Sequence, residues 1–400
     1  MRKVASASGV MHADPARSAI PRGTGADTKL FQYLAGAGSV TLAVGLFAAP
    51  DRAWLSLFQV GLALTGFGLA GILFVALQYA TGAGWSVVIR RAAEALCGTL
   101  WVGGVLVLFV LLVRPSLYEW TNPDVHLVGF KGFWLSRPFF LLRAVVYVGV
   151  WFVLSRAILV ESRRQDDDGD PIHTRRNARL SVMFIVAFAL TYCGASFDWI
   201  MSLEPEWFST IFGVYNFAGC FSSGLALLCV FTVHLMQRGP LKGVVTGEHL
   251  HDLGKLLFAF STFWMYIWFS QYMLIWYANI PEEAVYFTRR MSGAWGSLML
   301  LNVFLNWVVP FLALMPTGTK RSPAILMKVA LAVLAGRWLD LYMMLGPSLG
   351  SADAFFGVWE VAAIATLVGV TALAITSAFR RAAAIPLRDP YLQESLHHHQ

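Results

Sequence analysis

Charged side chains are scarce in this chain. They make up 13% of its 400 residues, whereas hydrophobic residues make up 57%. Soluble domains contain about 25% charged residues on average, so this composition indicates a protein that lies in a membrane. The formal net charge of +7 is spread between apolar runs and forms no basic patch. A nucleic-acid partner is therefore not expected.

Cysteine and histidine are too few, and too scattered, to form a redox centre. The four cysteines lie inside apolar runs without the CxxC spacing that iron–sulfur clusters and haem c attachment need. The nine histidines lie in tails, in loops or at the ends of apolar runs, so no pair at membrane depth can ligate haem. We expect no cofactor bound by this chain and a disordered His397–His399 run.

Long apolar runs account for most of the sequence, and a helix needs about 20 apolar residues to cross a bilayer. Such runs fall at about residues 29–49, 53–80, 90–113, 139–160, 179–201, 210–236, 253–277, 291–315, 325–345 and 355–379. They predict an all-α integral membrane protein of about ten transmembrane helices. This membrane domain, residues 29–380, would lie between an N-terminal tail, residues 1–28, and a C-terminal tail, residues 381–400. The first tail has no apolar core of signal-peptide length, so we expect it to stay uncleaved.

The lysines and arginines predict the orientation. If the N-terminus is cytoplasmic, most of them fall in cytoplasmic segments, including the highly charged loop at residues 161–178. Because basic loops stay on the cytoplasmic side, we expect both termini there. The acids at Glu204, Glu206, Glu282 and Glu283 would then face outward.

A weak internal repeat suggests how the helices are grouped. The segments Asp198–Pro205 and Asp340–Pro347 match at four of eight positions and keep the same spacing between aspartate and proline. This pattern predicts two four-helix bundles, formed by spans two to five and six to nine, with the first and tenth spans peripheral. Chance similarity between apolar helices is the alternative.

Charged residues within the spans are candidates for function, because such groups are costly in lipid unless they are paired or face water. Arg337 and Asp340 are three apart and share a helix face. Asp198 lies at the matching height of the fifth span, and Glu360 lies in the outer part of the tenth. We expect these four residues to form one cluster near the outer surface. It would be either a proton-exchanging or quinone-facing site, or a structural ion pair.

Two further polar groups are candidates for a proton path. One lies at the inner ends of spans six and seven and contains His249, His251, Asp252 and Lys255. Histidine beside carboxylate could transfer protons inward near neutral pH. The alternative is that these residues simply lie in the hydrated interface at the end of the helices. The other is Asn302 with Asn306, which are four residues apart on the eighth span. These two could line a chain of water molecules, or they could form hydrogen bonds between helices.

Three stretches of sequence resemble a known family. They are SFDWIMSLEP at 196–205 with FSTIFGVY at 208–215, HDLGKLLFAF at 251–260, and FSQYMLIWYANIPEE at 269–283. Together they are similar to the shorter of the two NrfD-type (polysulfide-reductase-like) membrane subunits of bacterial alternative complex III, the ActF type. That complex is a quinol:cytochrome c oxidoreductase. The resemblance covers about residues 28–380.

The resemblance implies a ten-helix protein with two four-helix bundles in the bacterial inner (plasma) membrane. It implies three kinds of partner: a longer sister NrfD-like membrane subunit, an iron–sulfur subunit and haem c subunits, which carry the electrons. In this family the sister subunit is the better candidate for quinol oxidation, and the shorter one is associated with a structural or proton-conducting role. The family's proposed polar path maps onto Asp198, Arg337 and Asp340, with the region of His251 and Asp252 inward. Whether quinone contacts this chain or its sister stays open.

Two other functions are compatible with the sequence. A stand-alone secondary transporter would also have intramembrane acids and glycine-rich helices. Each repeat unit would contain four helices, an even number, so the two units would be parallel copies, whereas many transporters have inverted repeats. The spans also lack the paired breaks at glycine or proline that are typical of transporters. A purely structural scaffold of the complex would need none of the polar residues for chemistry.

Overall fold

The structure is a computed structural model that describes residues 25–349, 354 and 356–399, so most of the predicted N-terminal tail lies outside the described part. The described residues form helices and turns without a strand. Eight helices are long and apolar enough to cross a membrane. The chain is therefore an all-α, multi-pass membrane protein, as its composition predicts.

The helices follow the predicted spans closely. Those of the first half are α1 (Gly25–Ala48), α2 (Pro50–Thr81), α3 (Val87–Leu96), α4 (Gly98–Val113), α5 (Gly129–Trp134), α6 (Arg137–Asp168) and α7 (Pro171–Trp199). Those of the second half are α8 (Phe212–Arg238), α9 (Gly247–Ala278), α10 (Pro281–Met291), α11 (Gly293–Val303), α12 (Val309–Leu314), α13 (Thr317–Arg321), α14 (Pro323–Leu345), α15 (Val358–Phe379) and α16 (Leu392–Leu396).

The predicted number of ten spans stays a prediction, because α9 and α14 are not among the eight apolar candidates. Both are long enough, with 32 and 23 residues. Helix α14 carries Lys328, Arg337 and Asp340, which lower its apolar character.

Helix α2 is the centre of the molecule. It is apolar on nearly all sides, and most of its residues are buried. It packs against α4, α7, α8 and α15. Close packing with α4 depends on Gly103, where an added Cβ would lie 2.3 Å from the backbone nitrogen of Thr65. Small residues of this kind let membrane helices approach each other.

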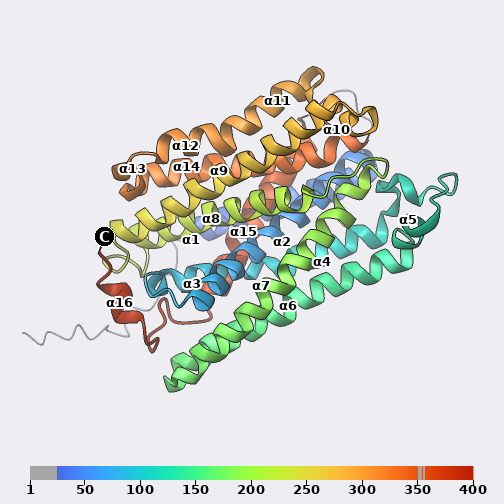
Figure 1. Cartoon of the computed structure of the whole chain (residues 1–400). Coiled ribbons are helices and arrows are strands. Elements are labelled where there is room, and N and C mark those ends of the chain that lie inside the picture. The colour runs from blue at the N-terminus through green and yellow to red at the C-terminus, as the bar shows by residue number, and fades with distance from the viewer. Residues whose placement is uncertain (1–24, 350–353, 355, 400) are drawn as a thin grey trace, which may run out of the picture.

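The remaining helices form layers around α2 (Figure 1). Helix α6 packs on α7 along one edge, whereas α9, α11, α12 and α14 gather along the opposite edge, with α8 between them and α2. Helix α1 packs mainly on α15. The interior that α8, α9, α11 and α14 enclose contains the polar site described below.

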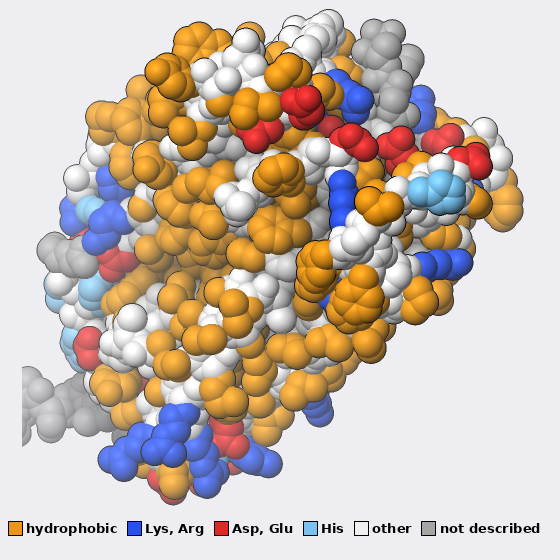
Figure 2. Space-filling model, turned by 45° about the vertical axis from the view of Figure 1, so that its right-hand side comes forward, with side chains coloured by type: hydrophobic (Ala, Val, Ile, Leu, Met, Phe, Trp, Pro, Cys, Tyr) orange, Lys and Arg blue, Asp and Glu red, His pale blue; other side chains and the backbone are white. Residues whose placement is uncertain are grey.

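The outer surface has the character of a membrane protein. Figure 2 shows hydrophobic side chains over the broad middle of one face, with charged side chains towards its ends. Leu142, Leu190, Leu274 and Leu300, from four different helices, are all more than half exposed. Such a belt is stable against lipid and would aggregate in water.

Candidate functional site

Arg337 and Asp340 form an ion pair inside the protein. Arg337 Nη1 lies 2.7 Å from Asp340 Oδ2, and the two side chains are 6% and 0% exposed. Their spacing of three residues brings both groups to one face of α14, as the sequence predicts. Because neither side chain is open to the surroundings, their charges must be balanced within the protein.

Three other helices donate hydrogen bonds to the Asp340 carboxylate. Tyr215 of α8 and Asn302 of α11 both donate to Oδ1, the latter at 3.0 Å. Trp264 Nε1 of α9 donates to Oδ2 at 3.4 Å. Together with Arg337 and its partner Asn216, these residues form what we call the Asp340 network. The network ties α8, α9, α11 and α14 together around one carboxylate.

A break in the eighth predicted span orients the asparagine pair. A π-helical turn, Phe304–Val308, follows α11 and contains Asn306. Asn306 Nδ2 donates to Asn302 Oδ1 at 2.7 Å, which leaves Asn302 Nδ2 to donate to Asp340. An added Cβ at Gly336 would lie 2.7 Å from Asn306 Nδ2. Turns of this type occur often at functional sites.

The network also reaches α7 through Asn216. Asn216 accepts from Arg337 Nη2 and donates to Ser196 Oγ at 2.9 Å. Gly219, one turn along α8, makes room for the guanidinium, because a Cβ there would lie 2.5 Å from Arg337 Nη1. A line of polar groups therefore crosses from α14 through α8 to α7.

Two small cavities flank the ion pair. A cavity of about 10 Å³ is lined by Asp340, Asn302 and Gln271, and one of about 20 Å³ is lined by Arg337, Asn216 and Trp199. Gln271 Nε2 and Trp199 Nε1 are buried without a hydrogen-bond partner in the described part of the chain. About 10–15 Å³ is enough for one water molecule. Each cavity therefore has the size and the free donor that a bound water needs.

A second ion pair connects the smaller cavity with the protein surface. Arg290 lines that cavity, and its Nη2 lies 2.6 Å from Glu204 Oε1. The Glu204 side chain is 10% exposed and also lies 3.6 Å from Arg289. Polar groups thus extend from Asp340 through the cavity and Arg290 to Glu204. Arg290 falls between the predicted spans 253–277 and 291–315, in a segment expected to face outward, and nothing in its spacing indicated a buried position.

Asp198 lies in a separate site, so the predicted single cluster is wrong for this residue. Arg143 of α6 donates to both of its carboxylate oxygens, at 2.8 and 2.9 Å. Tyr147 and Trp134 donate at 3.0 and 2.9 Å. Asp198 and Asp340 therefore each accept from an arginine, a tyrosine and a tryptophan. Arg143 lies inside the predicted span 139–160, and this position within a span could have indicated that it pairs with Asp198.

Glu360 is also outside the Asp340 network, which corrects the prediction for a second residue. Its Oε2 lies 2.6 Å from Arg52 Nη2 and accepts from the backbone nitrogen of Gly357 at 2.8 Å. Glu360 therefore caps the N-terminus of α15 and joins it to α2. Acidic residues are favoured in the first helical turn for this reason.

The group at the start of α9 is a contact with the C-terminal segment. Asp252 lies 2.7 Å from His398 Nε2 and 2.5 Å from Lys255 Nζ. His249 Nε2 lies 3.1 Å from the carbonyl oxygen of Ser395. His251 Nδ1 is buried without a partner in the described residues. The expectation of a disordered His397–His399 run is therefore wrong for His398, because α9 binds it.

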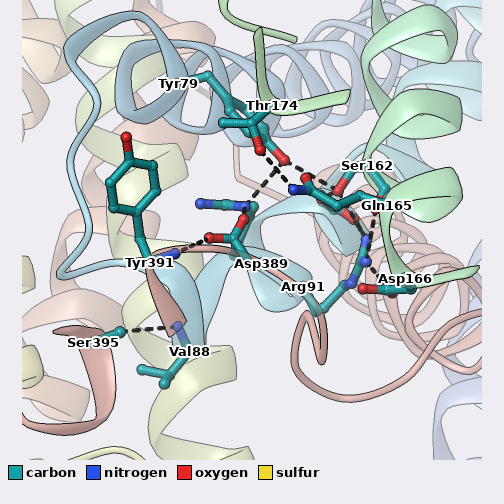
Figure 3. A network of polar contacts seen from close by, with 12 residues as sticks. Tyr79, Val88, Arg91, Ser162, Gln165, Asp166, Thr174, Asp389, Tyr391 and Ser395 are labelled. Atoms are coloured by element: carbon teal, nitrogen blue, oxygen red, sulfur yellow. Dashed lines mark hydrogen bonds and ion pairs between the residues drawn. The ribbon is translucent and has the colours of Figure 1, made fainter. Parts of the chain in front are cut away.

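The same end of the molecule contains a polar network around α3 (Figure 3). Asp389 accepts from Arg90, and Ser395 Oγ accepts from the Val88 nitrogen and donates to the Trp85 carbonyl. We call residues 389–398 the C-terminal clamp. The sequence predicted these residues only as part of a C-terminal tail, residues 381–400. The clamp is distant from the Asp340 network, because His249 and Trp264 are separated by about 22 Å along α9.

Comparisons with known proteins do not assign this chain to a family. No family model matches the chain, and a search of the curated proteins finds no match. Within the described residues, no group of three or more His, Cys, Asp and Glu side chains could hold a metal ion. The resemblance to the NrfD-type subunits therefore stays a prediction from sequence.

Acidic pH should loosen the C-terminal clamp through His249, which precedes the predicted span 253–277. His249 Nδ1 accepts from the Thr246 backbone, so it must be unprotonated. Burial, followed by the nearby His398, lowers the pKa of His249. The folded state then binds this proton less readily than the unfolded chain, so the stabilisation is complete above about pH 6.5 and is lost as pH falls.

Hydrogen exchange in residues 389–398 measures this effect. After correction for the intrinsic dependence of amide exchange on pH, we expect lower protection factors at about pH 5 than at about pH 7.5 in the wild type. His249→Gln should reduce the dependence on pH, because glutamine can replace histidine in the capping box with Thr246 without titrating. His398 and Asp252 are present in both proteins, so the two proteins differ in this region only at residue 249. Equal pH dependence in the two proteins would show that His249 is not the sensor.

Proposed function

We propose that this chain is an integral membrane subunit of a bacterial quinol:cytochrome c oxidoreductase complex. In this proposal it has no redox centre of its own and moves protons through the Asp340 network. Its partners are a sister NrfD-like subunit, an iron–sulfur subunit and haem c subunits in the inner membrane. The resemblance of residues 196–215 and 251–283 supports the choice of complex.

The arrangement around Asp340 is the observation on which the proton-moving role rests. The fully buried Asp340 carboxylate lines one water-sized cavity, which leads through Arg290 to Glu204, and its partner Arg337 lines a second. Water molecules and carboxylates are the usual elements of intramembrane proton relays. Gln271 Nε2, which lines the same cavity and has no partner among the described residues, supplies a donor for such a water.

The predicted topology gives this path a direction. With both termini cytoplasmic, Glu204 lies on the outer side, which is where quinol oxidation would release protons. We further propose ten spans in two four-helix bundles, with the Asp340 network in the second bundle and the Asp198 site in the first. Each aspartate accepts from one arginine, one tyrosine and one tryptophan of its own, and this similarity supports the division into two related bundles. Quinone can contact this chain or its sister subunit under the same scheme.

The double variant Arg337→Gln/Asp340→Asn tests the proposal in the intact complex. It removes both charges together, and the two amides can still bond to each other and to Tyr215 and Asn302. We expect the complex to assemble and its quinol-linked proton release to fall by about tenfold or more. Proton release is measured with a pH dye during turnover in proteoliposomes.

The matched control is Arg52→Gln/Glu360→Asn, which removes the charges of a partly exposed pair outside the network. The control should keep wild-type proton release. If the Arg337→Gln/Asp340→Asn complex assembles and releases protons at the wild-type rate, the Asp340 network is structural and the proton-moving role is wrong.

A further inference from the structure

An apolar crevice of about 580 Å³ lies between α1, α8, α14 and α15, away from the Asp340 network. Its walls include Leu331 and Val368, which are 51% and 44% exposed. On a membrane protein, exposed apolar side chains of this kind face lipid. The crevice is therefore open to the acyl chains of the bilayer.

The crevice is elongated along the helices. Its lining extends from Met327 to Trp338 on α14 and from Ile364 to Thr376 on α15. At 1.5 Å per residue these stretches are about 17–18 Å long. One leaflet contributes about half of a hydrocarbon core that is about 30 Å thick. The crevice thus extends over about the depth of one leaflet.

Two polar side chains interrupt this apolar lining. Thr371 is 7% exposed, and its hydroxyl has no hydrogen-bond partner in the described residues. The imidazole of His234 faces the same crevice from α8. Buried hydroxyl groups nearly always have a partner. An acceptor on a bound molecule, such as an ester carbonyl, would supply it for Thr371.

Basic side chains surround one end of the crevice. Arg238 follows His234 by four residues, and Arg380 follows Thr376 by four, so each shares a face with a lining residue. Lys328 is next to Met327, and all three basic side chains are exposed. None of the three forms an ion pair within the described residues. The first turn of α1 adds one charge of each sign, Lys29 and Asp27, so this end stays strongly positive.

We propose that the crevice binds an anionic phospholipid. The phosphate lies among Arg238, Lys328 and Arg380, and the glycerol backbone occupies the adjacent end of the crevice, where an ester carbonyl accepts from Thr371. One acyl chain continues from there between α14 and α15 towards Ile364. Basic pockets at the ends of membrane helices attract anionic lipid headgroups in this way. The inference uses none of the residues of the Asp340 network and does not depend on the proposed function.

Native mass spectrometry of the full-length chain, delipidated in detergent and then given phosphatidylglycerol or phosphatidylcholine, tests this proposal. We expect the wild type to retain a phospholipid and to prefer phosphatidylglycerol. Ala335→Trp fills the crevice and should weaken retention by about tenfold or more. The matched control is Ala189→Trp, which alters an exposed alanine on α7 and should have no effect.

Two further variants distinguish recognition of the lipid headgroup from binding of the glycerol ester and acyl chain. The triple variant Arg238→Gln/Lys328→Gln/Arg380→Gln should lose its preference for phosphatidylglycerol, by about fivefold per charge, and keep phosphatidylcholine binding. Thr371→Val keeps the side-chain volume and should weaken binding of both lipids, which covers the case in which Ala335→Trp does not fold. Equal retention by the wild type and Thr371→Val, or an unchanged preference in the triple variant, would overturn the proposal. So would the recovery of a quinone in place of phospholipid.

Discussion

Replacing Arg337 with glutamine should lower the free energy of unfolding by about 3–5 kcal/mol. The substitution leaves Asp340 charged in a place where it is 0% exposed. Tyr215, Asn302 and Trp264 still donate to it, but neutral donors do not replace the lost positive charge. Unfolding of the purified protein by a denaturing detergent, followed by circular dichroism, gives the value.

The reason for this loss is tested by adding Asp340→Asn to the same protein. If the cost comes from one unbalanced charge, removing the second charge should restore most of the lost stability. Arg114→Gln is the control, because Arg114 forms an exposed pair with Asp51 and should change stability by less than about 1 kcal/mol. A double variant that is less stable than Arg337→Gln would contradict this account of the pair.

Arg143→Gln should have an effect of similar size, about 3–5 kcal/mol, in the other half of the molecule. Arg143 makes both hydrogen bonds to the Asp198 carboxylate and lies over the Trp134 ring, 4.1 Å from its centre. Loss of the guanidinium leaves Asp198 buried with only two neutral donors. The same unfolding assay measures the change.

Arg143→Lys distinguishes geometry from charge at this site. Lysine keeps the charge but lacks the planar fork that bonds both oxygens, so it should recover only part of the stability. The control is Arg137→Gln, at the exposed start of the same helix, where a small effect is expected. Full stability in Arg143→Gln would mean that Asp198 has another partner.

The sequence predicted the membrane helices well, because twenty-residue apolar runs are long and lipid imposes helical structure. It also identified Asp340, Arg337, Asn302 and Asn306, because charged or amide side chains stand out within such runs. The i, i+3 and i, i+4 spacings placed these residues on common faces. The structure brings all four together on α11, the following π-helical turn and α14.

Partners from other helices could not be predicted in the same way. Asp198 and Glu360 were expected beside Asp340, yet each has its own arginine, Arg143 and Arg52. Height in the membrane can be estimated from sequence, whereas the rotation of one helix about its axis against another depends on packing. The C-terminal clamp was missed for a related reason, since its ion pairs and hydrogen bonds join residues far apart in the sequence and follow no periodic pattern.

Purification of the tagged full-length chain from its native membrane in mild detergent tests the central claim most directly. We predict that haem c and iron–sulfur proteins accompany it in a fixed ratio, shown by a reduced-minus-oxidised absorbance spectrum and by mass spectrometry. After denaturing separation, all haem should migrate with the other polypeptides. A chain that purifies alone, or one that itself binds the haem, would contradict the claim.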